Sequence, residues 1–154
     1  MFGLVCSAAL VMLATLSGCG LAGSDASCPG AGGPPPDLTP KDLVGTYSSS
    51  TGSVDLGDDG AFTSTGWPTD DQLEGIVSDP GQPRTGSGTW ELTAGDASDW
   101  PVSFAFREIS DYWDSEVKGG NFGSGLFVTG SRSAPRLYEL VGDPDACDIR
   151  IFRK

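Results

Sequence analysis

Apolar and polar residues alternate along several short segments of the chain beyond residue 42. The clearest case is Val102, Phe104 and Phe106, where every second residue is apolar. A period of two places such side chains on one face of a β-strand, which can then be buried. The same pattern, bounded by turn residues, predicts eight strands, over residues 43–50, 53–56, 61–65, 88–93, 101–109, 125–130, 136–141 and 148–153.

The segments between these strands contain turn signals and one helix candidate. Asp59-Gly60 favours the positive φ angles of a tight hairpin between the second and third strands. Pro144 between Asp143 and Asp145 predicts another turn. Residues 70–77 are the helix candidate, because Thr69 and Gln72 have the spacing of a capping box.

This arrangement predicts an all-β domain over residues 37–154. Many short strands separated by turns favour an antiparallel meander that is closed or nearly closed into a barrel, with a sandwich as the alternative. Closure is attractive because it removes the unpaired edges of an open sheet.

The chain begins differently, with the uncharged apolar stretch LVCSAALVMLATL at residues 4–16. It is short for a membrane-spanning helix but matches the apolar part of a secretory signal; a buried helix is the structural alternative. The first basic residue is Lys41, so we expect the true start to lie upstream, where a basic segment would precede the apolar one. Residues 1–18 are therefore predicted to be a signal peptide.

Small residues follow this stretch and lead to a cysteine. Leu16, Ser17, Gly18 and Cys19 resemble a bacterial lipobox, at which a diacylglyceryl group is attached to the cysteine and the signal is removed. The resemblance implies that Cys19 is the mature N-terminus and that its acyl chains hold the protein on the outer leaflet of the cell membrane, outside the cytoplasm. Residues 19–36, rich in Gly, Ala, Ser and Pro, are predicted to be a flexible, disordered tether.

Two cysteines then remain. Cys6 belongs to the signal and Cys19 to the lipid, which leaves Cys28 in the tether and Cys147 near the end of the chain. A pair of cysteines in an exported protein predicts a disulfide, and two free thiols are the alternative.

A wider resemblance covers residues 38–154. The stretches DLVGTY, DDGAFT, GSGTWEL, PRLYELVGDPD and IRIFRK are similar to those of uncharacterised actinobacterial lipoproteins. Gly45-Thr46-Tyr47 is also similar to the Gly-x-Trp that opens lipocalin-like barrels, with Tyr in place of Trp. This second resemblance implies an up-and-down barrel whose interior holds a small apolar ligand. It carries over no binding residue.

The charge of the chain is strongly negative. Nine Lys and Arg residues stand against 21 Asp and Glu residues, for a formal net charge of -12. Such a surface repels nucleic-acid backbones, so we expect no nucleic-acid partner. Acidic, solvated loops are the simpler interpretation of the charge itself.

The residue types also exclude several chemistries. The chain has no histidine, which excludes a Ser-His-Asp triad and a histidine-ligated zinc site. The loop that begins at Asp55 lacks calcium ligands at its third and twelfth positions, where Gly57 and Gly66 stand. We therefore expect no enzyme activity, no cofactor and no metal.

Four aromatic residues lie in or beside predicted loops and are the candidates for contact with a ligand or partner. Plugging the ends of the barrel is the alternative role for them. They are Trp67, Trp100, Tyr112 and Trp113.

Two functions fit this chain. It either binds a small apolar ligand inside the barrel, or it is an accessory envelope protein that contacts other proteins. A filled interior favours the second. Seven large residues supply the filling if most point inward: Phe62, Trp90, Phe104, Phe106, Phe127, Tyr138 and Phe152.

Overall fold

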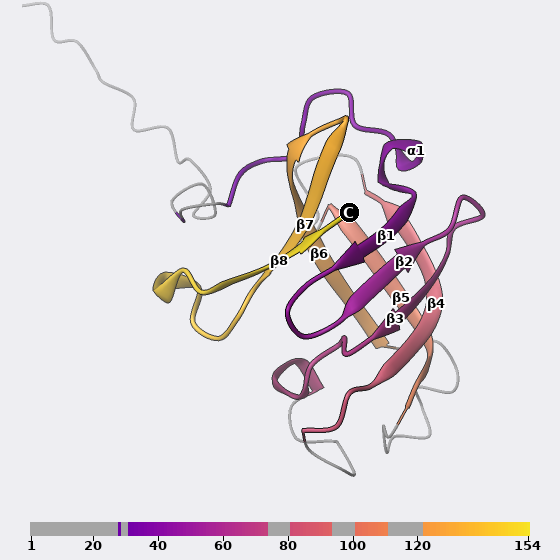
Figure 1. Ribbon diagram of the computed structural model, residues 1–154, viewed down its shortest axis with the longest axis vertical. Coiled ribbons are helices and arrows are strands. Elements are labelled where there is room, and N and C mark those ends of the chain that lie inside the picture. The colour runs from indigo at the N-terminus through magenta and orange to yellow at the C-terminus, as the bar shows by residue number, and fades with distance from the viewer. Residues whose placement is uncertain (1–27, 29–30, 74–80, 94–100, 111–121) are drawn as a thin grey trace, which may run out of the picture.

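The computed structural model describes residues 28, 31–73, 81–93, 101–110 and 122–154. In them, eight antiparallel strands follow one another around a closed barrel (Figure 1), which confirms the predicted meander. The strands are β1 (Gly45–Ser48), β2 (Ser53–Leu56), β3 (Ala61–Thr65), β4 (Thr85–Leu92), β5 (Val102–Ile109), β6 (Phe122–Ser131), β7 (Ala134–Leu140) and β8 (Ile149–Arg153).

Side chains of the barrel itself fill its interior. The Phe62 ring lies edge-on to Phe104 and Phe106, with ring centroids 5.0 and 4.9 Å apart. Gly86 leaves the space for Phe106, because a Cβ at Gly86 would lie 2.6 Å from that ring. The buried apolar cluster comprises Leu43, Tyr47, Val54, Leu56, Phe62, Trp67, Leu73, Trp90, Val102, Phe104, Phe106, Ile109, Leu126, Val128, Leu137 and Phe152.

Two of the seven large residues expected to fill the interior point outward instead. Phe127 lies between core residues of β6, and Tyr138 follows the core residue Leu137 on β7, so both face the outside of the barrel. Their rings stack there with centroids 5.1 Å apart. The other five large residues are in the core, which is enough to fill it.

A bulge in β5 breaks the period-two pattern. Ser87 pairs with Glu108 while Gly88 pairs with Phe106, so Arg107 is an extra residue on β5. Arg107 and Glu108 are both exposed, and Ile109 returns to the core. The extra residue thus keeps an apolar side chain inward on both sides of the bulge.

The barrel closes between β8 and β1, and this is its weakest seam. Ser48 and Arg153 are the one residue pair in register there, whereas β7 and β8 share five pairs. β1 turns away after Ser48, so most of β8 has no strand partner on that side.

A one-turn helix, α1 (Pro40–Leu43), covers one end of the barrel (Figure 1). It was not predicted from the sequence, because four residues carry no helical period. Asp42 accepts hydrogen bonds from the Thr39 hydroxyl at 2.6 Å and the Thr39 amide at 2.8 Å, and Arg132 donates to it. The Thr39 hydroxyl above all holds the pKa of Asp42 below its ordinary value.

The predicted helix over residues 70–77 is a 3-10 turn, η2 (Asp70–Leu73), at the opposite end of the barrel (Figure 1); residues 74–77 lie outside the described residues. The Thr69 amide donates to the Gln72 side chain at 3.0 Å, as in the expected capping box. The turn predicted at Pro144 is η4 (Pro144–Ala146).

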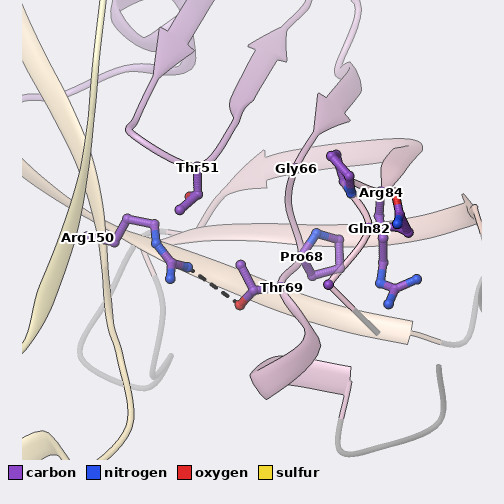
Figure 2. A pocket seen from close by; sticks show the side chains of 9 residues that line it. Thr51, Gly66, Pro68, Thr69, Gln82, Arg84 and Arg150 are labelled. Atoms are coloured by element: carbon purple, nitrogen blue, oxygen red, sulfur yellow. Dashed lines mark hydrogen bonds between the residues drawn. The ribbon is translucent and has the colours of Figure 1, made fainter. Parts of the chain in front are cut away.

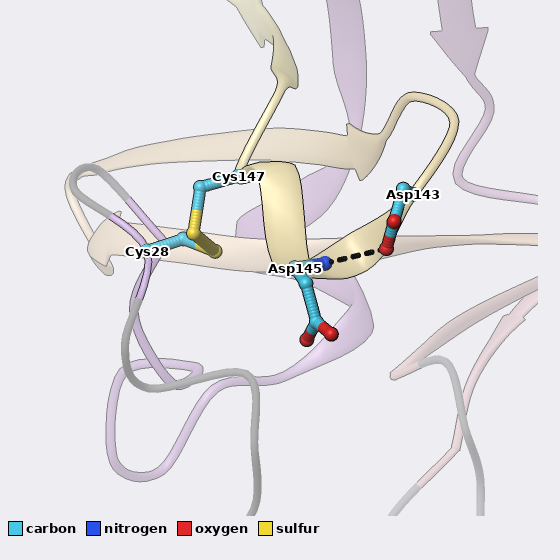
Figure 3. Close-up of a disulfide and its surroundings, with 4 residues drawn as sticks. All are labelled: Cys28, Asp143, Asp145 and Cys147. Atoms are coloured by element: carbon cyan, nitrogen blue, oxygen red, sulfur yellow. Dashed lines mark hydrogen bonds between the residues drawn. A yellow bond between two sulfur atoms is a disulfide. The ribbon is translucent and has the colours of Figure 1, made fainter.

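The last part of the tether is fixed to the barrel. Cys28 and Cys147 form a disulfide, with Cα atoms 5.2 Å apart (Figure 3), as the cysteine count predicted. Beside it, the Asp145 amide donates to the Asp143 carboxylate at 3.0 Å. Tyr138 donates to the Gly32 carbonyl at 3.4 Å, and Pro35 is buried. The segment expected to be a flexible spacer up to Pro36 is therefore held against β7 from Gly32 onward.

Candidate functional site

A buried carboxylate lies at the η2 end of the barrel. Leu137 points into the core, so the alternation along β7 also turns Glu139 inward, where it is 4% exposed. Its Oε2 accepts hydrogen bonds from Trp67 Nε1 at 2.9 Å and from Gln72 Nε2 at 2.7 Å. Sequence reasoning missed this residue, although its inward position in a predicted strand was a usable signal.

Arg150 completes the network from the neighbouring strand. β8 places it beside Glu139, since the two are partners in register. Its guanidinium forms an ion pair with Glu139 Oε1, and it also lies 3.5 Å from the Thr69 hydroxyl. The side chain of Arg150 is 16% exposed, so this ion pair is largely removed from water. A buried pair with several further hydrogen bonds fixes the geometry of this end.

Trp67 is part of the same network and closes the end of the barrel. It is fully buried, and its ring packs against Phe104 and Phe106 at 4.9 and 5.3 Å. The Ser64 hydroxyl donates to its carbonyl at 2.6 Å, and the Trp67-Pro68 peptide bond is cis. Trp67 therefore plugs this end of the barrel, which was the alternative role expected for the aromatic residues in the loops. Trp100, Tyr112 and Trp113 lie outside the described residues.

A pocket of about 400 Å³ opens beside this network (Figure 2). It lies at the β8–β1 seam, with Arg150 on one side and Thr51, from the β1–β2 turn, on the other. The remaining lining is mostly Gly, Pro and hydroxyl residues around a buried Arg84: Gly66, Pro68, Thr69, Gly81, Gln82 and Pro83. The structure therefore places an accessible hollow at this end of the barrel.

The polar groups around Glu139 are engaged with one another. Three donors from the described residues are directed at the two oxygens of Glu139, so the carboxylate is held in one orientation. In the described part of the chain, no three Cys, Asp or Glu residues are grouped as metal ligands would be. Within the same residues, no helix is long and apolar enough to cross a membrane.

The residues of the predicted lipid anchor, Leu16, Ser17, Gly18 and Cys19, lie outside the described residues. Cys28, nine positions after Cys19, is the first residue that the structure describes.

The fold and the site together define a small, disulfide-linked, eight-stranded antiparallel barrel with a packed interior. No family model, curated protein or solved structure matches the chain.

Proposed function

We propose that the protein is a lipid-anchored envelope protein that acts outside the cytoplasm through contacts made by the outside of its barrel. The filled interior carries this proposal. Sixteen buried apolar residues form one cluster inside the barrel. In a barrel of about eight strands, side chains packed in this way occupy the space that a small apolar ligand would need, which favours contacts on the outside.

The predicted export of the protein is supported by its cysteines. A disulfide persists in an oxidising compartment and is rare in the cytoplasm. The bond between Cys28 and Cys147 therefore agrees with the signal and the lipobox pattern that precede it. The proposed anchor is a diacylglyceryl group on Cys19, and the proposed location is the outer leaflet of the cell membrane.

The anchor has a direct test with a matched control. We expect Cys19→Ala to lose labelling by a fatty-acid probe in cells and Cys6→Ala, a change within the predicted signal, to keep it. Labelling that survives in Cys19→Ala would remove the anchor from the proposal.

The pocket beside Arg150 favours a second candidate function, the binding of a small polar ligand at the barrel end. Native mass spectrometry of the whole protein, released from detergent, distinguishes the two candidate functions. For the first function, we expect the native mass of the acylated chain alone. We also expect that a second protein can be cross-linked to the barrel in cells. A small molecule that co-purifies and is lost in Thr51→Trp, which fills the pocket, would favour the second.

A further inference from the structure

The basic residues of this acidic protein are concentrated near its C-terminus. Residues 132–154 contain five of the nine basic residues but only four of the 21 acidic ones. Three of the five have partners: Arg132 pairs with Asp42, Arg150 pairs with Glu139, and Lys154 donates to the Asp42 carbonyl at 3.0 Å. The other two, Arg136 and Arg153, make no hydrogen bond or ion pair with any described residue.

These two arginines lie directly opposite each other. Arg136 on β7 and Arg153 on β8 are partners in register, and both follow the outward alternation because their neighbours Leu137 and Phe152 are in the core. Side chains at such positions have Cβ atoms about 5 Å apart, and like charges there destabilise the sheet. The fold thus holds two positive charges together without a carboxylate between them.

Hydroxyl groups extend this pair on both sides. Ser48 on β1 is the register partner of Arg153, and Thr129 on β6 is the register partner of Arg136. Ser48 and Arg153 are exposed, and Arg136 is half-buried. A Cβ on Gly130 would lie 3.5 Å from Arg136 Nε, so this guanidinium lies over the backbone at Gly130. Thr129 is 6% exposed and lies beside Gly32, so the donors that reach solvent are the guanidinium groups of Arg136 and Arg153 and the Ser48 hydroxyl, on β7, β8 and β1 (Figure 1).

Among the described strands, no acidic side chain shares this face with Arg136, Arg153 and Ser48. β1, β6 and β8 contain no Asp or Glu, and the one acidic residue of β7, Glu139, is turned into the barrel. On β2, which follows β1 in the barrel, Ser53 is the register partner of Ser48, and Asp55 accepts a hydrogen bond from the Thr46 hydroxyl. This face is therefore locally basic on a molecule whose overall charge is -12.

We propose that Arg136 and Arg153, with the Ser48 hydroxyl beside them, form a binding site for a phosphate-type oxyanion on the outside of the barrel. Guanidinium groups bind phosphate through pairs of parallel hydrogen bonds. An anion between the two arginines also offsets the repulsion that the register imposes. The phosphate is either free or part of a lipid headgroup, and the site does not depend on the proposed anchor.

The test measures the reaction of phenylglyoxal with each arginine of the full-length protein in detergent, by peptide mass spectrometry. Inorganic phosphate at ten times its dissociation constant should slow modification of Arg136 and Arg153 about tenfold. Arg107, an exposed arginine beside Glu108 on β5, is the internal control and should react at an unchanged rate. Equal slowing at Arg107 would mean general screening and would overturn the site.

Two further measurements identify the source of the anion and control for misfolding of a variant. Mixed micelles of the detergent and phosphatidylglycerol, compared with inorganic phosphate at equal phosphate concentration, should protect more strongly if the ligand is a headgroup and less if it is a free anion. Arg136→Gln should abolish the rise in Tm that phosphate gives the wild-type protein, while Arg107→Gln keeps it. No protection by either probe, or an unchanged Tm response in Arg136→Gln, would overturn the proposal.

Discussion

At the scale of single residues, Glu139 determines how one end of the barrel is closed. It joins β7 to Trp67 and Gln72, which lie between β3 and β4, and to Arg150 on β8. Its inward position follows from the alternation in Leu137-Tyr138-Glu139, but its partners do not. They depend on the register of β7 with β8 and on the path of the chain after β3, which a sequence pattern does not contain.

Replacing Glu139 should therefore be costly. Glu139→Gln leaves the Arg150 guanidinium largely buried without its counter-charge, and we expect a loss of about 3 kcal/mol in the free energy of unfolding. Urea unfolding followed by tryptophan fluorescence measures it. The double variant Glu139→Leu with Arg150→Met should be far less destabilised than the sum of its single changes. A loss of less than about 1 kcal/mol in the free energy of unfolding of Glu139→Gln would show that the ion pair does not stabilise this end of the barrel.

Asp42 gives a pH-dependent contribution at the other end. Its pKa in the folded protein is below the ordinary 3.8, so its contribution is complete above that value and disappears as the pH falls through the folded pKa. Asp42→Asn should lower Tm more at neutral pH than at about pH 2. Asp58→Asn, in an exposed turn, is the control and should give the same small difference at both pH values. An equal effect of Asp42→Asn on Tm at the two pH values would contradict a lowered pKa of Asp42.

At the scale of the elements, the strands were the most predictable part of the molecule. All eight were found, because a sheet with one buried face imposes a period of two on its residues. The exceptions have physical causes. β4 begins at Thr85, three residues before the prediction, because Thr85-Gly86-Ser87 contains no apolar residue. The β5 bulge at Arg107 was invisible because the sequence does not record which residues pair.

Gly88 has a structural role that a substitution can test. It lies at the β5 bulge, and a Cβ there would lie 2.0 Å from the Ala105 carbonyl oxygen. We expect Gly88→Ala to reduce the free energy of unfolding by about 2 kcal/mol or more, since the backbone of β5 must move. Gly123→Ala is the matched control, because its nearest neighbour is 4.0 Å away. An equal decrease of Tm in Gly88→Ala and Gly123→Ala would contradict the close pairing of β4 with β5 at Gly88.

At the scale of the whole molecule, the disulfide joins the two ends of the described chain. It closes a loop with a sequence separation of 119 residues. The cysteine count predicted the pair, whereas the docking of the tether on Tyr138 had no signal in a Gly- and Pro-rich segment. With Cys28 fixed, the link to the proposed anchor is nine residues long, which reaches about 30 Å at most.

Removing this bond should destabilise the protein and lengthen the link. Cys28→Ser with Cys147→Ser should reduce the free energy of unfolding by up to about 4 to 5 kcal/mol, if the bond acts by restricting the unfolded chain. Proteolysis between Cys28 and Pro36 should also become faster, since the segment loses its attachment. Denaturant unfolding and peptide mapping measure the two effects, and unchanged stability would show that the barrel does not depend on the bond.

Export of the protein and the lipid at Cys19 are the basis of its proposed function. Its most direct test is the mass of the N-terminal peptide of the protein isolated from the cells that make it. We expect a peptide that begins at Cys19, carries a diacylglyceryl group and comes from the membrane fraction. A cytoplasmic chain that still contains residues 1–18 and has no acyl group would contradict this proposal.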